Sequence, residues 1–134
     1  MKYFVCEHCG NIVEMVNDSG VPVVCCGEKM KELVPGSVDA AVEKHVPVVT
    51  EDGDKVKVFV GEVEHPMVEE HYIGWIAIET KEGMQRKYLK AGEKPEAVFA
   101  LADGDKLVAA YAWCNIHGLS LIHISEPTRL GMIS

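Results

Sequence analysis

Five cysteines and six histidines are the residues of this 134-residue chain best suited to bind a transition metal. Four cysteines lie in the first 26 residues, Cys6 and Cys9 in CEHC and Cys25 and Cys26 side by side. The fifth, Cys114, lies in WCNIHG near the other end. Four thiolates can close a tetrahedral site around iron or zinc, whereas one thiolate with several imidazoles can leave a coordination position open. The sequence therefore predicts two metal sites with different roles.

The four N-terminal cysteines have the spacing of one closed site. A C-x-x-C pair puts two sulfurs on one turn, and the second pair follows after fifteen intervening residues, which suits a returning hairpin. A structural zinc ribbon is the ordinary interpretation, and an iron that carries electrons is the alternative. Adjacent ligands such as Cys25 and Cys26 are less common and should distort the tetrahedron. His8, between the first two cysteines, is expected to be a solvated loop residue.

Four of the histidines lie in short, distinctive contexts. They are His45 in EKHVPV, His65 in EHPM, His71 in EEHYIGW and His117 in CNIHG. A lone histidine is more often a surface or core residue than a ligand. The C-x-x-H spacing, however, lets one turn deliver the sulfur of Cys114 and a nitrogen of His117 to the same ion. Imidazole suits iron, zinc, copper and nickel, so the metal stays open, and the alternative for Cys114 is a buried, inert thiol.

Short strands and turns must position these residues. Residues 1–36 form a module below the roughly 40 residues at which a hydrophobic core normally suffices, so metal should supply much of its folding energy. Further on, KVKVFVGEV alternates, with Val56, Val58 and Val60 on one face, and HYIGWIAIET is apolar enough for burial on both sides. MQRKYLK, EAVFAL and KLVAAYAWC follow, separated by turn-forming clusters. The pattern predicts a mainly β fold, with an antiparallel sandwich or barrel over residues 37–118.

The last segment, residues 119–134, does not continue this pattern. SLIHISEPTRLGMIS has no clear periodicity, and Pro127 interrupts it. We interpret residues 119–134 as a non-native or disordered tail, because the segment resembles translated vector sequence. His123 is therefore given little weight as a ligand.

Composition argues against several classes of function. Thirteen basic and twenty-one acidic residues give a formal charge of −8, which disfavours nucleic acid or an anionic membrane as a partner. We expect neither a transmembrane helix, which needs roughly 18 apolar residues in a row, nor a signal peptide. The odd cysteine count and the adjacent pair favour thiols kept reduced in the cytoplasm over disulfides.

Six short motifs together resemble those of desulfoferrodoxin, the two-iron form of superoxide reductase. In chain order they are CEHCGNIVE, VCCGEKM, EKHVPV, EHPM, EEHYIGWI and CNIHG, and they span residue 1 to about residue 118. The match is specific, because six separate motifs would have to coincide by chance. The resemblance implies a small desulforedoxin-like iron module followed by an immunoglobulin-like antiparallel β-sandwich that carries a catalytic iron at its edge.

The resemblance also implies roles for individual residues. It implies a first iron held by Cys6, Cys9, Cys25 and Cys26, and a second held by His45, His65, His71 and His117 in a plane with Cys114 as the axial ligand. Glu43 and Lys44, in EKHVPV, match the family's functional pair beside the second iron. Lys44 would attract superoxide, and Glu43 would be the carboxylate that occupies the open position once the iron is oxidised.

The implied reaction is the one-electron reduction of superoxide to hydrogen peroxide. A rubredoxin-type donor would supply the electron, and a homodimer is expected. The axial thiolate should push electron density onto the iron. Two other interpretations remain: an electron-transfer protein in which only the four-cysteine iron is functional, and a zinc-ribbon interaction module joined to an unrelated β-domain. The histidines and Cys114 favour the enzyme, because neither alternative needs them.

Charge predicts the effect of replacing Lys44. Ferrous iron with four neutral imidazoles and one thiolate carries a local charge of about +1, and Lys44 adds another, so an anion is attracted although the chain is acidic. We expect Lys44→Ala to slow association with superoxide and to reduce its salt dependence, with an intact iron spectrum. Pulse-generated superoxide at several ionic strengths measures this, and unchanged association would remove Lys44 from the mechanism.

Overall fold

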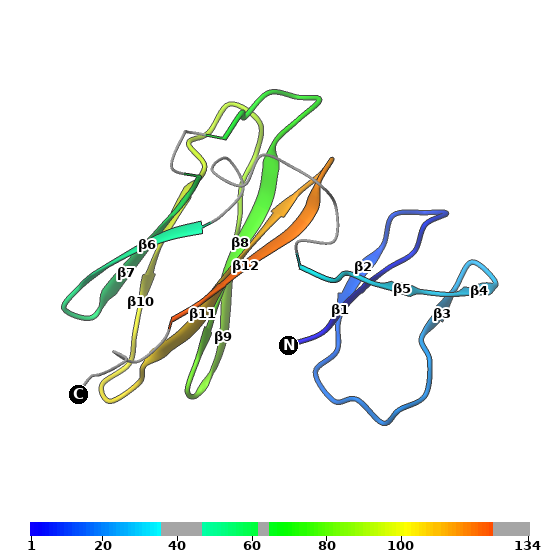
Figure 1. Cartoon of the computed structure of the whole chain (residues 1–134), viewed down its shortest axis with the longest axis horizontal. Coiled ribbons are helices and arrows are strands. Elements are labelled where there is room, and N and C mark those ends of the chain that lie inside the picture. Colours follow the sequence, from blue (N-terminus) through cyan, green and yellow to red (C-terminus); the bar gives the residue numbers. More distant parts are fainter. Residues whose placement is uncertain (36–46, 62–64, 125–134) are drawn as a thin grey trace.

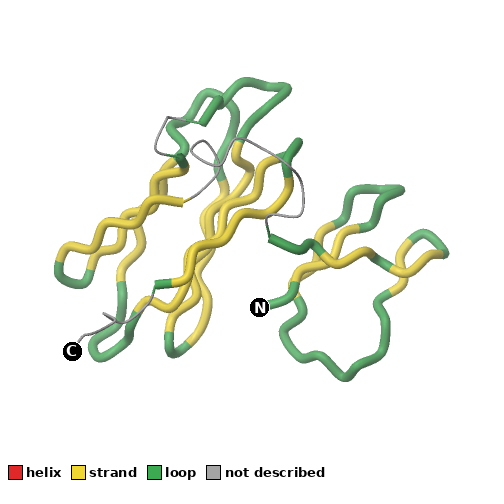
Figure 2. Tube along the Cα trace, in the orientation of Figure 1, coloured by secondary structure: helices red, strands yellow, loops and turns green. Residues whose placement is uncertain are grey.

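The computed structural model describes residues 1–35, 47–61 and 65–124, and all regular secondary structure in these ranges is β-strand (Figures 1 and 2). The N-terminal module contains five short strands. They are β1 (Tyr3–Val5), β2 (Ile12–Glu14), β3 (Val24–Cys25), β4 (Glu28–Lys29) and β5 (Lys31–Glu32). One sheet has the order β2-β1-β5, and β3 and β4 form a separate hairpin. The described residues include no helix long and apolar enough to cross a membrane.

Seven longer strands form the second part of the chain. They are β6 (Pro47–Asp52), β7 (Lys55–Val60), β8 (Ile73–Thr80), β9 (Gly83–Tyr88), β10 (Glu96–Ala100), β11 (Leu107–Cys114) and β12 (Gly118–His123). They make a three-stranded sheet of order β10-β7-β6 and a four-stranded sheet of order β12-β11-β8-β9, and every pair is antiparallel. Figure 1 shows the two sheets as the layers of a sandwich. The prediction of a mainly β chain, with a small module before an antiparallel sandwich, is confirmed.

Alternating valines of β7 form one side of the sandwich core. Val56, Val58 and Val60 are fully buried, while the alternating Lys55 and Lys57 are exposed, as the sequence pattern predicts. The valines belong to one apolar cluster with side chains of β8, β10 and β11. Burial of a side chain of this size contributes roughly 1.5–3 kcal/mol, so the second part of the chain can fold around its own core.

Strand β8 is buried on both of its faces, which confirms the prediction for HYIGWIAIET. Ile76 and Ile78 point into the sandwich core. Trp75 and Ala77 point the other way, into a second apolar cluster that includes Tyr3 of the module. The ring centroids of Tyr3 and Trp75 are 5.2 Å apart. The module therefore covers the outer face of the four-stranded sheet.

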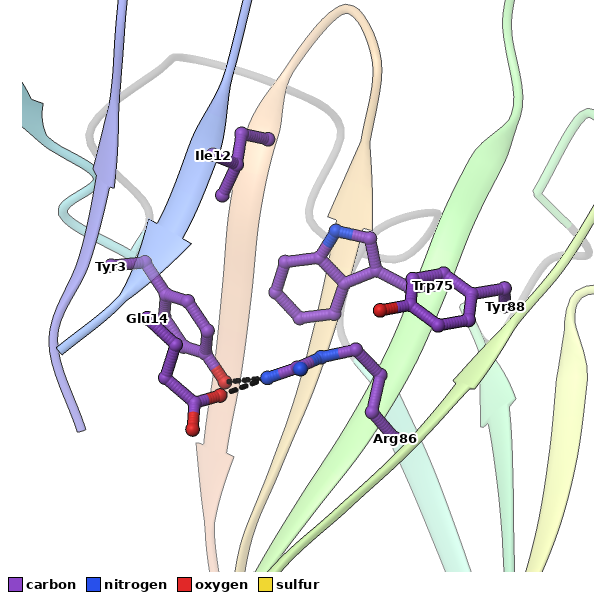
Figure 3. Close-up of a pocket in the computed structure, with 6 residues that line it drawn as sticks. All are labelled: Tyr3, Ile12, Glu14, Trp75, Arg86 and Tyr88. Atoms are coloured by element: carbon purple, nitrogen blue, oxygen red, sulfur yellow. Dashed lines mark hydrogen bonds and ion pairs between the residues drawn. The ribbon is translucent and has the colours of Figure 1, made fainter. Parts of the chain in front are cut away.

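Polar contacts between the module and the sandwich lie beside this aromatic contact (Figure 3). The Arg86 guanidinium on β9 donates to the Glu14 carboxylate on β2, and it also donates to the Tyr3 hydroxyl over 3.1 Å. It lies 5.1 Å from the centre of the Trp75 ring. With Ile12 and Tyr88 these residues line a cavity of about 160 Å³ between the module and the sandwich. We call Arg86, Glu14 and Tyr3 the latch.

Two of the seven longer strands were not expected from the sequence. Strand β6 begins at a proline and ends in acidic residues, so it shows little of the alternation that marks β7. Strand β12 continues past residue 118, so Leu119 to His123, assigned to the tail, lie in a strand paired with β11. Both strands form because they pair with a neighbouring strand, although their own sequences show little periodicity. The division into residues 1–36, 37–118 and 119–134 stays a prediction.

The latch leads to a prediction about stability. Arg86→Ala leaves the partly buried Glu14 carboxylate without its cation, so we expect a loss of about 1–3 kcal/mol in the free energy of unfolding. Glu14→Gln keeps the shape and one acceptor and should cost less. Denaturant titration followed by tryptophan fluorescence measures both variants. Equal stability of the wild type and the two variants would show that the latch does not hold the module.

Candidate metal centres

Four cysteine sulfurs from two turns of the module lie close enough to share one ion. Cys6 follows β1 and Cys9 lies in the turn after it, while Cys25 ends β3 and Cys26 begins the turn to β4. The four sulfurs all lie within 4.8 Å of one another. The Cys9–Cys25 and Cys25–Cys26 sulfur distances are 3.6 and 4.0 Å. Because metal–sulfur bonds of about 2.3 Å place tetrahedral ligands about 3.8 Å apart, this is the spacing of a metal site.

The adjacent cysteines can both face the site because the chain reverses at the second of them. Cys25 pairs with Glu28 across the hairpin, so Cys26 and Gly27 are its two turn residues. Their φ angles are +54° and +80°, as a type I′ turn requires. Among the described residues, Cys26 is the one non-glycine with positive φ, a conformation that costs of order 1–3 kcal/mol. Asparagine or glycine usually fills this position, so the cysteine marks a functional constraint.

The first cysteine pair sits in a loop closed by backbone hydrogen bonds. The Gly10 amide donates to the Cys6 carbonyl over 2.9 Å, and the Cys6 amide donates to the Asn11 carbonyl over 2.8 Å. The Asn11 side-chain amide in turn lies 3.7 Å from the sulfur of Cys25. The loop thus turns Cys9 back toward Cys6 and also touches the second pair.

The thiols hold their protons unequally. Hydrogen bonding from the Cys9 backbone amide lowers the pKa of Cys6 to about 6. Contact with the Cys6 sulfur raises the pKa of Cys26 to about 12, and it also raises the pKa of Cys25. One thiolate is therefore stable near neutral pH, but further thiolates beside it need a cation. Metal binding releases the remaining protons, so the metal affinity of the cluster falls as the pH falls.

The module has little else to hold it together. Within the described residues 1–35, the buried hydrophobic side chains are Tyr3, Cys6 and Met30. Tyr3 faces the sandwich rather than an internal core, and Cys6 is itself a member of the metal cluster. Metal ligation and docking on β8 must therefore replace the hydrophobic core that the module lacks.

A second ligand group lies where two loops meet at one end of the sandwich. One ligand atom each from His65, His71 and Cys114 lies within 4.8 Å of the others. Cys114 ends β11, and β8 begins at Ile73, two residues after His71. The antiparallel register pairs Cys114 with Ile73. Strand pairing thus brings together ligands that are far apart in the sequence, and His65 and Cys114 are almost completely buried there.

Hydrogen bonding selects the ring nitrogen that His65 presents. A carbonyl oxygen can only accept, so the His65 Nδ1, 2.6 Å from the Pro66 carbonyl oxygen, carries the proton. The buried Nε2 of the neutral ring then holds the lone pair that a metal ion needs. The His71 ring lies beside it, with centroid distances of 4.7 Å to His65 and 5.1 Å to His117. Three imidazoles therefore line one side of the site.

His117 reaches the site from the same loop as Cys114. Its Nδ1 is 3.9 Å from the Cys114 sulfur. The loop between them closes the β11–β12 hairpin, where Cys114 pairs with Gly118. Gly118 has a φ of +83°, which suits the end of a three-residue hairpin loop. The Cys114 sulfur thus lies beside imidazoles, which disfavours the alternative of an inert core thiol.

The structure describes some of the predicted site residues, and others lie outside the described ranges. His65, His71 and Cys114 form one ligand group, and His117 lies beside it, in contact with Cys114 and His71. His45, Glu43 and Lys44 lie outside the described residues, so their roles stay predictions. His8 pairs with Glu28 at the surface of the module, as expected of a solvated loop residue.

Comparison with known proteins decides the family. The Desulfoferrodoxin family model matches residues 37–121, and the model of the desulfoferrodoxin N-terminal domain matches residues 1–33. The chain belongs to the desulfoferrodoxin family. The desulfoferrodoxin of Nitratidesulfovibrio vulgaris is 47% identical over 117 residues, which are 87% of this chain and 91% of that protein. A desulfoferrodoxin homolog of Archaeoglobus fulgidus is also 47% identical, over 89% of this chain and 94% of its own length.

Solved structures give the same assignment. The superoxide reductase of Treponema pallidum aligns with a TM-score of 0.77 and 40% identity, over 90% of this chain and 97% of that one. The superoxide reductase of Giardia intestinalis, titled as the 1Fe form, aligns with a TM-score of 0.54 and 35% identity. That alignment covers 61% of this chain and 97% of the Giardia protein.

Both donor sets fit the two mononuclear irons of a desulfoferrodoxin. The module offers four soft thiolates at tetrahedral spacing, a set that suits iron and leaves no position open. The sandwich offers the buried Cys114 sulfur together with neutral imidazole nitrogen, a mixed set that iron also accepts. The chain therefore has a four-cysteine iron site and a histidine–cysteine iron site.

Two residues with structural roles escaped sequence reasoning, Arg86 between the module and the sandwich and Asn115 beside the histidine–cysteine site. Arg86 holds the module to the sandwich, but nothing near it in the sequence points to Glu14. Asn115 lies inside the CNIHG motif and bonds to the loop that carries His71. Its position in a hairpin loop between two ligands was an available signal, because asparagine side chains often bond to backbone there.

The burial pattern predicts the effect of metal removal. Chelation should leave the module with few stabilising contacts, so we expect the amides of β1 and β2 to lose most of their protection from hydrogen exchange. The amides of β7 and β8 should stay protected, because their core needs no metal. Exchange mass spectrometry of metal-loaded and chelated protein measures both regions. Equal protection of the module in the two samples would contradict this account of its stability.

Proposed function

We infer that this protein is a superoxide reductase that removes superoxide by one-electron reduction. The observation that carries this inference is the buried Cys114 sulfur beside imidazoles in a fold shared with solved superoxide reductases. One superoxide anion, one electron and two protons give one hydrogen peroxide. Iron held by His65, His71 and Cys114 would supply the electron and the position at which the substrate binds.

The described residues prepare this site in three ways. The bond from His65 to the Pro66 carbonyl puts the proton of the neutral ring on Nδ1 and leaves Nε2 as the atom that can bind a metal. Cys114 supplies a thiolate that the almost complete burial of its side chain keeps from bulk water, and thiolate donation raises electron density at the metal. The pairing of β8 with β11 holds the loops of His71 and Cys114 together. These residues bind and orient, and they are in place before substrate arrives.

Three further residues complete the proposed site. His45 is the fourth imidazole ligand, Lys44 attracts the anionic substrate, and Glu43 is the carboxylate beside it. The support for these roles is the EKHVPV motif and the charge of the chain, because a protein of formal charge −8 needs a local cation to attract an anion.

We further propose that the four-cysteine iron passes electrons onward. Cys9 and Cys26 are exposed, which suits electron entry from a rubredoxin-type donor. The Giardia protein, titled as the 1Fe form, corresponds to 61% of this chain, which supports a module that assists turnover without being required for it. A cytoplasmic homodimer completes the proposal, with reduced thiols and a small module suited to exchanged contacts as its support.

Replacing Cys114 tests the reaction. Cys114→Ser removes the thiolate, so we expect superoxide reduction to fall by more than about 100-fold, since even partners of metal ligands cost about 10–100-fold. One of the two thiolate-to-iron absorption bands should disappear, and the band of the four-cysteine iron should persist. Pulse-generated superoxide with peroxide detection measures turnover. Normal peroxide yield from the variant would place the chemistry elsewhere.

A further inference from the structure

One side chain connects the two loops that carry ligands of the histidine–cysteine site. The Asn115 Oδ1 accepts a hydrogen bond of 2.9 Å from the Tyr72 amide, and its Nδ2 donates one of 3.0 Å to the Glu70 carbonyl. The Asn115 backbone amide also donates to the Tyr72 carbonyl over 3.2 Å. Glu70 and Tyr72 are the residues on either side of His71, and Asn115 directly follows Cys114.

The backbone of His71 itself is held by a different bond pair. Its amide donates to the Val68 carbonyl over 3.1 Å, and its carbonyl accepts from the Val68 amide over 3.0 Å. These bonds shape the turn but do not join it to β11. The β8–β11 pairing holds the chain after His71 at Ile73, and Asn115 adds hydrogen bonds to the residues directly before and after His71.

We propose that Asn115 is a positioning residue that sets the placement of the His71 imidazole relative to the Cys114 sulfur. An asparagine is required because the bonds to Tyr72 and Glu70 need one acceptor and one donor on the same planar group. Aspartate has the same shape but cannot donate, and it would set a negative charge against the Glu70 carbonyl. The site affected is the one on which the proposed function rests.

The alternative is an asparagine that merely stabilises a hairpin loop. In that case its loss would lower the stability of the whole protein without a specific effect on one metal site. Two controls in the same molecule separate the two possibilities. The hydrogen-exchange protection of β7 reports on the sandwich core, and the four-cysteine iron reports on the module, while the histidine–cysteine iron reports on the bonds made by Asn115. Asn17→Asp is the matched control, since it makes the same amide-to-carboxylate change at an exposed position in the module loop after β2.

The test compares Asn115→Asp, Asn115→Ala and Asn17→Asp in the full-length, iron-loaded protein. We expect both Asn115 variants to release iron from the histidine–cysteine site about 10–100-fold faster in the presence of a chelator and to shift the band of that iron. The band of the four-cysteine iron should not change. In the chelated protein, the Tyr72 amide should lose hydrogen-exchange protection in Asn115→Ala, which removes its acceptor, and keep it in Asn115→Asp, whose carboxylate still accepts. Asn17→Asp should match wild type throughout.

Two results would overturn the proposal. One is wild-type iron release and an unshifted band in both Asn115 variants. The other is an equal loss of iron from both sites, which would reduce Asn115 to a general stabiliser. Neither readout depends on turnover, so failure of the wild-type protein to reduce superoxide would reject the proposed function while these measurements still decide the role of Asn115.

Discussion

The antiparallel pairing of β8 with β11 is the interaction on which the rest of the structure depends. Its register sets Cys114 opposite Ile73, and so brings the loop of His71 to the end of β11. The same pairing builds the middle of the four-stranded sheet, whose inner face closes the sandwich core and whose outer face receives the module. Core packing, ligand convergence and module docking are therefore not independent features, because all three need this register.

The two metal sites differ in how the surrounding fold is stabilised. In the module, few buried side chains surround the thiolates, so the ion stabilises the fold and the ligand turns tolerate backbone strain at Cys26. In the sandwich, a large core fixes the strands first, and the ligands are delivered by loops at their ends. A scaffold that folds without the ion can keep one coordination position open for a substrate. The structural difference is consistent with the proposed division, in which the module site handles electrons and the sandwich site binds the substrate.

The sequence predicted those parts of the molecule that local pattern controls. Alternation identified β7 and its buried valines, and the C-x-x-H spacing identified Cys114 and His117 as neighbours. It could not predict β6 or β12, because their residues alternate weakly and they exist through pairing with β7 and β11. It also missed the contacts of Arg86 and Asn115, which join segments that only the tertiary fold brings together. The sequence motifs predicted which residues belong to each metal site. The contacts that hold these residues in place were visible only in the structure.

The double burial of β8 has a consequence for how the sandwich could exist without its module. The outer face that Tyr3 covers presents Trp75, Ala77, Tyr111 and Leu119. Cut free of the module, this face would be a contiguous apolar surface of the kind that drives aggregation in soluble monomers. A family member that lacks the module must therefore have polar residues on this face or cover the face with another subunit. The boundary between the two parts is thus a constraint on solubility, and gain or loss of the module in evolution requires coordinated change on the sheet beneath it.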